Sequence, residues 1–163
     1  MKTIVAQPIS REAFAPYGEY YSMLEPAGHA LCGELYAFYP DRLSAASNSA
    51  IGFSPLVVDK PEHMVIRTVE FHTHSWEMLL PLNDDMVVHV APLTGETYLP
   101  ELTKAFVIPK GTLVKFHPTV WHLAPMPVHE QKLYAMAMVA QCTYLHDCTV
   151  VQLEENRQME IVL

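Results

Sequence analysis

Short runs of aliphatic and β-branched residues, separated by turn residues, recur along most of this chain. Their length is typical of β-strands rather than of long helices. At least seven strands are predicted: Leu56 to Val58, Met64 to His74, Glu77 to Leu82, Met86 to Ala91, Ala105 to Pro109, Thr112 to His117 and Leu133 to Ala140. We therefore expect a mainly β protein, a sandwich or barrel, with one domain over residues 1–163.

The two ends of the chain carry weaker signals. Residues 2–8 predict a first strand, and Ser10 can cap a short helix that continues to Ala15 and ends near Pro16. Residues 21–52 mix prolines, glycines and aromatic residues irregularly, which indicates loops with brief strands. The polar residues 154–159 predict a terminal helix or a tail.

Composition narrows the classes of partner. The chain has 18 acidic against 10 basic residues, a net charge of −8, so its surface should repel nucleic acid. The longest apolar run, Leu133 to Ala140, is far below the ~20 residues that a membrane-spanning helix needs. The first residues turn polar before an export signal could form, and the 3 cysteines form no Cys-x-x-Cys pair. We expect a cytoplasmic protein with reduced thiols and neither a nucleic-acid nor a membrane partner.

Histidines and carboxylates provide the candidate chemistry. On a strand from Ile66 to His74, alternation places Glu70, His72 and His74 on one face. On a helix the two imidazoles would lie ~200° apart, so a shared metal depends on the strand prediction. Glu77 follows just after a turn, and His122 comes from a later hairpin.

Three or four imidazole and carboxylate donors, held rigidly, suit a divalent metal and leave positions open for substrate oxygens. We therefore predict that His72, His74, Glu77 and His122 bind an ion of the zinc, manganese, nickel or iron type. The simpler alternative is that His72 and His74 are exposed polar residues, because 9 histidines align some pairs by chance. The presence of both Glu77 and His122 favours the interpretation of these residues as a metal site.

Other titratable residues leave more than one interpretation open. Lys115 and His117 share a strand face and could point either into a pocket or into solvent. His89 lies in an apolar run and is expected to be a partly buried structural histidine.

Ordered segments between the start of the chain and residue 122 match one known pattern. They are Met1 to Pro8, Glu12 to Gly18, Glu70 to His72, Glu77 to Leu82, Val90 to Pro92, Ala105 to Gly111 and Phe116 to His122. These segments resemble the ureidoglycolate lyase family, also called ureidoglycolate hydrolase. The resemblance implies a cupin double-stranded β-helix, a homodimer, and cleavage of ureidoglycolate, a small carboxylate-bearing substrate, to glyoxylate and urea.

The chain also departs from this family. Phe71 stands where the family usually has Arg, Glu77 where it usually has Gln, and Thr119 where it has Gly, while His74 is an additional imidazole. The additional His74 moves the site toward the metal-binding His-x-His and Glu arrangement of other cupins, whereas Thr119 suggests a different local backbone before His122.

The resemblance also suggests further roles and leaves alternatives open. The catalytic candidates are Glu70, which could fix an imidazole tautomer, and Lys115 or His117, which could donate a proton or bind the substrate carboxylate. One alternative is another metal-dependent cupin reaction on a small oxygen-rich acid. The other is a non-catalytic module that binds a small molecule.

Overall fold

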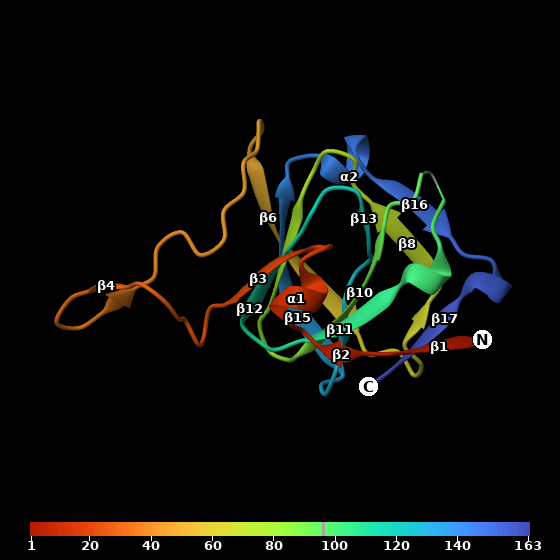
Figure 1. The fold of residues 1–163 in the computed structure, drawn as a ribbon, viewed down its shortest axis with the longest axis horizontal. Coiled ribbons are helices and arrows are strands. Elements are labelled where there is room, and N and C mark those ends of the chain that lie inside the picture. The colour runs from red at the N-terminus through yellow and green to blue at the C-terminus, as the bar shows by residue number, and fades with distance from the viewer. Residues whose placement is uncertain (96) are drawn as a thin grey trace.

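The computed structural model describes residues 1–95 and 97–163, and strands dominate it. Figure 1 shows the strands wrapped around one body, from which the segment that carries β4 (Leu31–Cys32) projects to the side. Within the described residues, no helix has the length and apolar character needed to cross a membrane.

One layer is a five-stranded sheet in the order β3-β12-β9-β15-β6, in which all pairings are antiparallel. Its strands are β3 (Gly18–Ser22), β12 (Thr112–Phe116), β9 (Glu77–Pro81), β15 (Lys132–Ala140) and β6 (Ile51–Asp59). The opposite layer runs β13-β10-β11-β2, and β14 also pairs with β10. Its strands are β13 (Val120–Trp121), β10 (Met86–Pro92), β11 (Lys104–Ile108), β2 (Gln7–Pro8) and β14 (Met126–Pro127).

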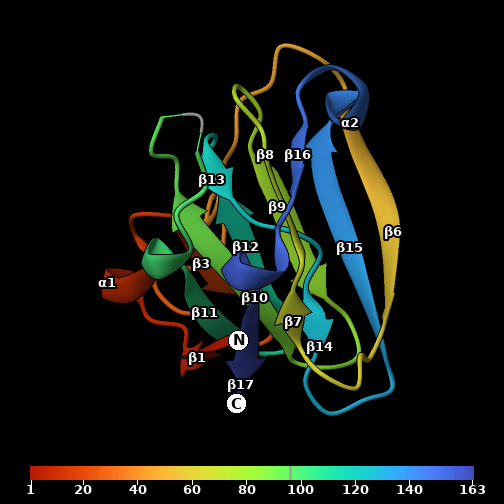
Figure 2. The same cartoon turned by 90° about the vertical axis from the view of Figure 1, so that its right-hand side faces the viewer.

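Smaller sheets complete the fold. They contain β1 (Lys2–Val5), β17 (Met159–Val162) and β7 (Val65–Ile66); β8 (Thr68–Phe71) with β16 (Thr149–Gln152); and β4 (Leu31–Cys32) with β5 (Ala37–Phe38). The helices are α1 (Arg11–Phe14) and α2 (Thr143–His146), with single 3₁₀ turns at Pro100–Leu102 and Glu155–Arg157. Figure 2 shows α2 at one end of the molecule, where it connects β15 with β16.

Strand β10 separates two hydrophobic clusters. Val88 and Val90 pack in the cluster that contains Leu79 and Phe116, whereas Val87 packs on the other side with Trp121. Both faces of β10 are therefore buried, which explains why its sequence is a continuous apolar run rather than an alternating one.

The prediction of a mainly β fold is confirmed, and the runs from residue 77 to 140 form β9, β10, β11, β12 and β15 close to the predicted bounds. The short helix after Ser10 is also present, and the Ser10 side chain accepts a hydrogen bond from the Ala13 amide. Strand β6 begins at Ile51, well before the predicted Leu56, because it is an edge strand and an edge tolerates Pro55.

Two predictions about local structure were wrong. The expected strand from Met64 to His74 is divided into β7 and β8 and ends at Phe71. The expected terminal helix or tail is only one 3₁₀ turn, followed by β17, which pairs in parallel with β1. Pairing between the two ends of the chain depends on contacts that no local pattern records.

A buried group of imidazoles and carboxylates

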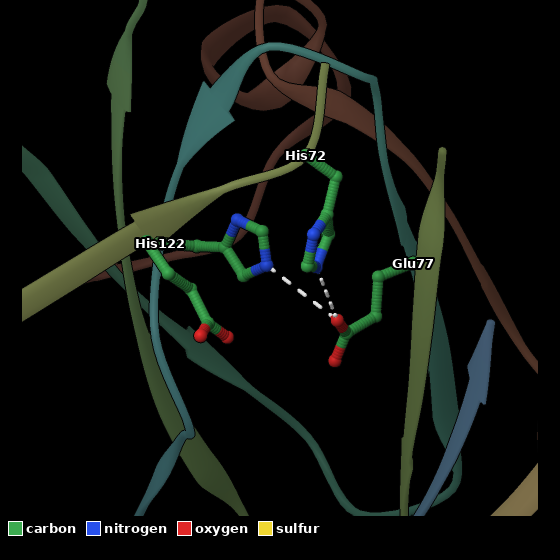
Figure 3. A group of neighbouring side chains, drawn as sticks. His72, Glu77 and His122 are labelled. Atoms are coloured by element: carbon green, nitrogen blue, oxygen red, sulfur yellow. Dashed lines mark hydrogen bonds and ion pairs between the residues drawn. The ribbon is translucent and has the colours of Figure 1, made fainter. Parts of the chain in front are cut away.

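Two histidines and two glutamates gather at one end of the sheets. Glu70, His72, Glu77 and His122 each offer one ligand atom, and these atoms all lie within 4.8 Å of one another. His72, Glu77 and His122 are 1%, 5% and 2% exposed, and Figure 3 shows both imidazoles turned toward the Glu77 carboxylate.

Separate strands supply these side chains. Glu70 lies in β8, His72 follows that strand directly, and Glu77 is the first residue of β9. His122 follows β13, and it forms an isolated bridge with Glu70. In this bridge each main-chain amide donates to the other residue's carbonyl, at 2.7 and 2.8 Å. The bridge therefore fixes the position of His122 against β8.

Main-chain oxygens fix the orientation of both imidazoles. His72 Nδ1 donates a hydrogen bond to the main-chain oxygen of Asp147 at 2.8 Å, and His122 Nδ1 donates to the main-chain oxygen of Val120 at 2.8 Å. The Phe116 ring also stacks on His122, with centroids 4.9 Å apart and planes at 19°. Because Nδ1 carries the proton in each ring, each neutral imidazole has its lone pair at Nε2.

The two Nε2 atoms face one carboxylate oxygen. Glu77 Oε2 lies 3.1 Å from His72 Nε2 and 3.6 Å from His122 Nε2. Among the described residues, His122 Nε2 has no hydrogen-bond partner. Two neutral imidazole lone pairs and an ionised carboxylate are all acceptors, so a cation must lie between them, either a proton on an imidazole or a metal ion.

The electrostatics of the group agree with this need for a cation. Burial alone would raise the pKa of Glu77, but the imidazoles of His122 and His72 outweigh burial and lower it to about 2. Burial alone would lower the pKa of His72, but its contacts with Glu77 and Asp147 outweigh that effect and raise it. The site therefore attracts positive charge.

Two residues near the group carried no signal in the sequence. The Tyr144 hydroxyl, in α2, donates to Glu77 Oε2 at 3.2 Å, and its ring meets His72 edge-on, with centroids 5.8 Å apart. Cys148 Sγ donates to Glu70 Oε2 at 3.4 Å. Burial and then Glu77 raise the pKa of Tyr144, and burial and then Glu70 raise that of Cys148 to about 12. Both side chains therefore stay protonated near neutral pH.

The Asp147 carboxylate brings this segment to the site. It accepts hydrogen bonds from the amides of Thr73, His74 and Ser75, at 2.8, 3.0 and 2.8 Å. These bonds turn the chain away from strand geometry after Phe71. The alternation that placed His74 beside His72 therefore does not continue, and His74 is exposed.

The structure thus brings together His72, Glu77 and His122 of the predicted ligands, with Glu70 in the place expected for His74. Lys115 pairs with Met78 and so lies on the sheet face opposite to Glu77, which pairs with Phe116. The Lys115 Nζ forms an ion pair with Glu19 at 2.8 Å and donates to the Ser44 oxygen at 2.8 Å. These two contacts hold the Lys115 ammonium on the face of the sheet that points away from the group.

His117 and His89 also lie outside the group. His117 follows β12. The hydrogen bond from Lys115 and, last, the charge of His117 lower the pKa of Glu19. His89 was expected to be partly buried but is 2% exposed, on the face of β10 that it shares with Val87. Burial, and then the charge of His122, lower the pKa of His89 to about 3.

The sequence is similar to that of one known protein family. The family model described as ureidoglycolate lyase matches residues 1–160. The ureidoglycolate lyases of Pseudomonas aeruginosa LESB58 and Pseudomonas fluorescens Pf-5 are 30% and 28% identical to the chain over 132 residues, which is 75% of this chain and 75% of theirs.

A solved structure is similar in fold alone. It is a dTDP sugar isomerase from Desulfovibrio desulfuricans G20, with a TM-score of 0.50 and 10% identity over 86% of this chain and 85% of the isomerase. The expected cupin-type fold is thereby confirmed. Because the family model matches residues 1–160, almost the whole of this sequence, the chain belongs to the ureidoglycolate lyase family.

Proposed function

We propose that this chain cleaves ureidoglycolate to glyoxylate and urea at the group of Glu70, His72, Glu77 and His122, with a divalent metal bound there. The observation that carries the proposal is the pair of fixed imidazoles, each of which turns Nε2 toward the buried Glu77 carboxylate. Two main-chain oxygens hold the imidazole Nδ1 atoms, an arrangement that commonly fixes histidines as metal ligands.

The residues present fit such an ion. Imidazole nitrogen and carboxylate oxygen suit zinc, manganese, nickel or iron, and His72, Glu77 and His122 would hold it. The two carboxylates of the group also balance a charge of +2. When bound, the ion would supply Lewis-acid stabilisation of negative charge on substrate oxygens.

Glu70 is the residue best placed to move the proton. Cleavage breaks the O–H bond of the substrate hydroxyl, forms the carbonyl of glyoxylate, and sends the electrons of the C–N bond to the leaving nitrogen. Glu70 is only half-buried, so it can accept the hydroxyl proton and return it to that nitrogen. The proton balance then closes within the site, and urea leaves neutral.

Assembly and compartment are further parts of the proposal. We propose a homodimer in which the projecting β4-β5 hairpin contacts a second copy. Leu31, Leu35, Tyr36 and Phe38 of this hairpin are 53%, 94%, 65% and 57% exposed, an apolar surface of the kind that marks an interface. We also propose a cytoplasmic enzyme, because the 3 cysteines are free thiols.

Metal analysis together with a urea assay tests the proposed function. The purified protein should contain close to one equivalent of a divalent metal and release urea from one enantiomer of ureidoglycolate. A His72→Ala, His122→Ala double variant should lose both properties. The variant His63→Ala is a matched control, because the His63 side chain is 65% exposed.

The possible outcomes separate the alternatives. Full metal content in the double variant would refute the ligand assignment. Metal binding without urea release from either enantiomer would refute the lyase proposal and favour another metal-dependent reaction, which the carboxylate of Glu77 in place of the family's Gln also suits.

A further inference from the structure

Tyr144 differs from the other polar side chains of the site in its exposure. Its side chain reaches Glu77 Oε2, yet the residue is 54% exposed, whereas His72, Glu77 and His122 are almost fully buried. Tyr144 therefore lies between solvent and the buried group, and a small molecule that approaches Glu77 from this side must contact it.

The helix that carries Tyr144 is held in place on both sides of this residue. Before it, the Thr143 hydroxyl donates to the Ala140 oxygen at 2.8 Å and to Ser75 Oγ at 3.2 Å. After it, the Asp147 carboxylate accepts the three amides of residues 73–75. The position of the Tyr144 main chain relative to His72 is therefore held by bonds other than the contact of Tyr144 with Glu77.

Hydrogen-bond donors are scarce around the group. Glu70 and Glu77 are acceptors when ionised, and the Nδ1 protons of His72 and His122 are used by main-chain oxygens. The Cys148 thiol is a weak donor and faces Glu70. Among these five side chains and Tyr144, the Tyr144 hydroxyl is therefore the one strong hydrogen-bond donor whose proton is not bound to a main-chain oxygen.

A substrate carboxylate would be bound more tightly if the protein offered such a donor in addition to the proposed ion. The resemblance indicates that the family usually has Arg at the position of Phe71. In this chain the Phe71 ring packs against the Trp121 ring, with centroids 4.5 Å apart. Lys115 is paired with Glu19 on the other face of the sheet. Neither residue 71 nor Lys115 therefore offers a cation to a carboxylate beside Glu77.

We propose that Tyr144 binds the substrate, its hydroxyl donating a hydrogen bond to a carboxylate oxygen of a small acid that lies beside Glu77. This inference rests on the proposed function for the chemistry of the substrate, and it assigns the recognition of the carboxylate to a residue outside the group of four. Tyr144 exchanges its 3.2 Å hydrogen bond to Glu77 for one to the ligand.

The test uses oxalate as the probe and compares the wild-type protein with Tyr144→Phe, which removes only the hydroxyl. Both proteins are loaded with one equivalent of Co²⁺, and oxalate affinity is measured by calorimetry. A lost hydrogen bond of about 1 kcal/mol predicts that the variant binds oxalate about 5-fold more weakly. The affinity for Co²⁺, measured by its absorption, should stay within about 2-fold. Tyr134→Phe is the control, because Tyr134 is a similarly exposed tyrosine in β15.

Each outcome decides the inference. Equal oxalate affinity in wild type and Tyr144→Phe, or a wild type that does not bind oxalate, overturns it. A large loss of Co²⁺ affinity in the variant also overturns it, since Tyr144 would then act through Glu77. Kinetics provide a second measurement, in which KM for ureidoglycolate should rise more than kcat falls. Failure of the proposed function is distinct, because it appears in the wild-type protein as an absence of urea release, whatever the oxalate affinities are.

Discussion

The main-chain oxygen of Asp147 accepts the Nδ1 proton of His72, at 2.8 Å, and thereby turns the His72 lone pair toward Glu77. The same residue holds the turn after His72 through its carboxylate. Asp147 thus connects the segment that carries Tyr144 with the segment that carries the imidazole. The site depends on this connection as much as on its own four side chains.

Asp147→Asn should destabilise the protein and weaken metal binding. One carboxylate oxygen becomes an NH₂ group that faces main-chain amides, so at least one of the three hydrogen bonds is lost and a donor faces a donor. We expect a decrease of about 1–3 kcal/mol in the free energy of unfolding, measured by urea denaturation. Asp59→Asn is the control and should change stability little, because Asp59 is exposed. Unchanged stability in Asp147→Asn would show that these bonds do not hold the turn.

The same contact explains where sequence patterns succeed and fail in this protein. Alternation and apolar runs identify β9, β10, β12 and β15, because one or both faces of these strands pack in the core. They fail after Phe71, because Asp147, which is far along the chain, takes up the amides of residues 73–75. His72, Glu77 and His122 could be predicted from residue type. Alternation also placed Glu70 on the face of His72, where the structure has it. The place of Tyr144 could not be predicted, because it is set by α2, which is far along the chain from Glu77.

Acid should destabilise the fold through His89. The folded protein holds this buried imidazole neutral down to about pH 3, whereas the unfolded chain takes up a proton near the ordinary pKa of 6.5. The contribution of His89 to stability is therefore complete above pH 6.5 and is lost as the pH falls toward 3. Between pH 7.5 and pH 5, the wild type should lose about 2 kcal/mol more than His89→Gln.

Urea denaturation at the two pH values measures this difference. His63→Gln, which removes an exposed imidazole, should keep the acid sensitivity of the wild type. The role of His89 is refuted if His89→Gln and the wild type lose equal amounts of stability over this pH range.

Charge on the projecting hairpin should separate the proposed dimer. Leu35→Asp with Tyr36→Asp puts two carboxylates on the apolar surface of the β4-β5 hairpin, where burial in an interface would desolvate them. Light scattering after gel filtration should give twice the chain mass for the wild type and one chain mass for the double variant. Leu163→Asp, at an apolar position that is 60% exposed and lies outside the hairpin, should remain dimeric. A monomeric wild type, or a double variant that stays dimeric, would refute this interface.

Glu77→Gln should weaken the metal site while leaving the fold intact. The substitution keeps the size of the side chain and restores the amide that the resemblance assigns to the family at this position. It removes the negative charge that faces His72 and His122 at 3.1 and 3.6 Å, and a neutral amide oxygen is a poorer donor to a divalent ion. Urea release should therefore fall at limiting metal and recover in part when metal is added.

A titration of urea release against added metal distinguishes this effect from a direct part of Glu77 in the reaction. Weaker binding shifts the half-saturating metal concentration upward and leaves the plateau near that of the wild type. A lower plateau with an unchanged half-saturating concentration would contradict the assignment of Glu77 as a metal ligand, and would instead place its charge among the groups that stabilise the transition state.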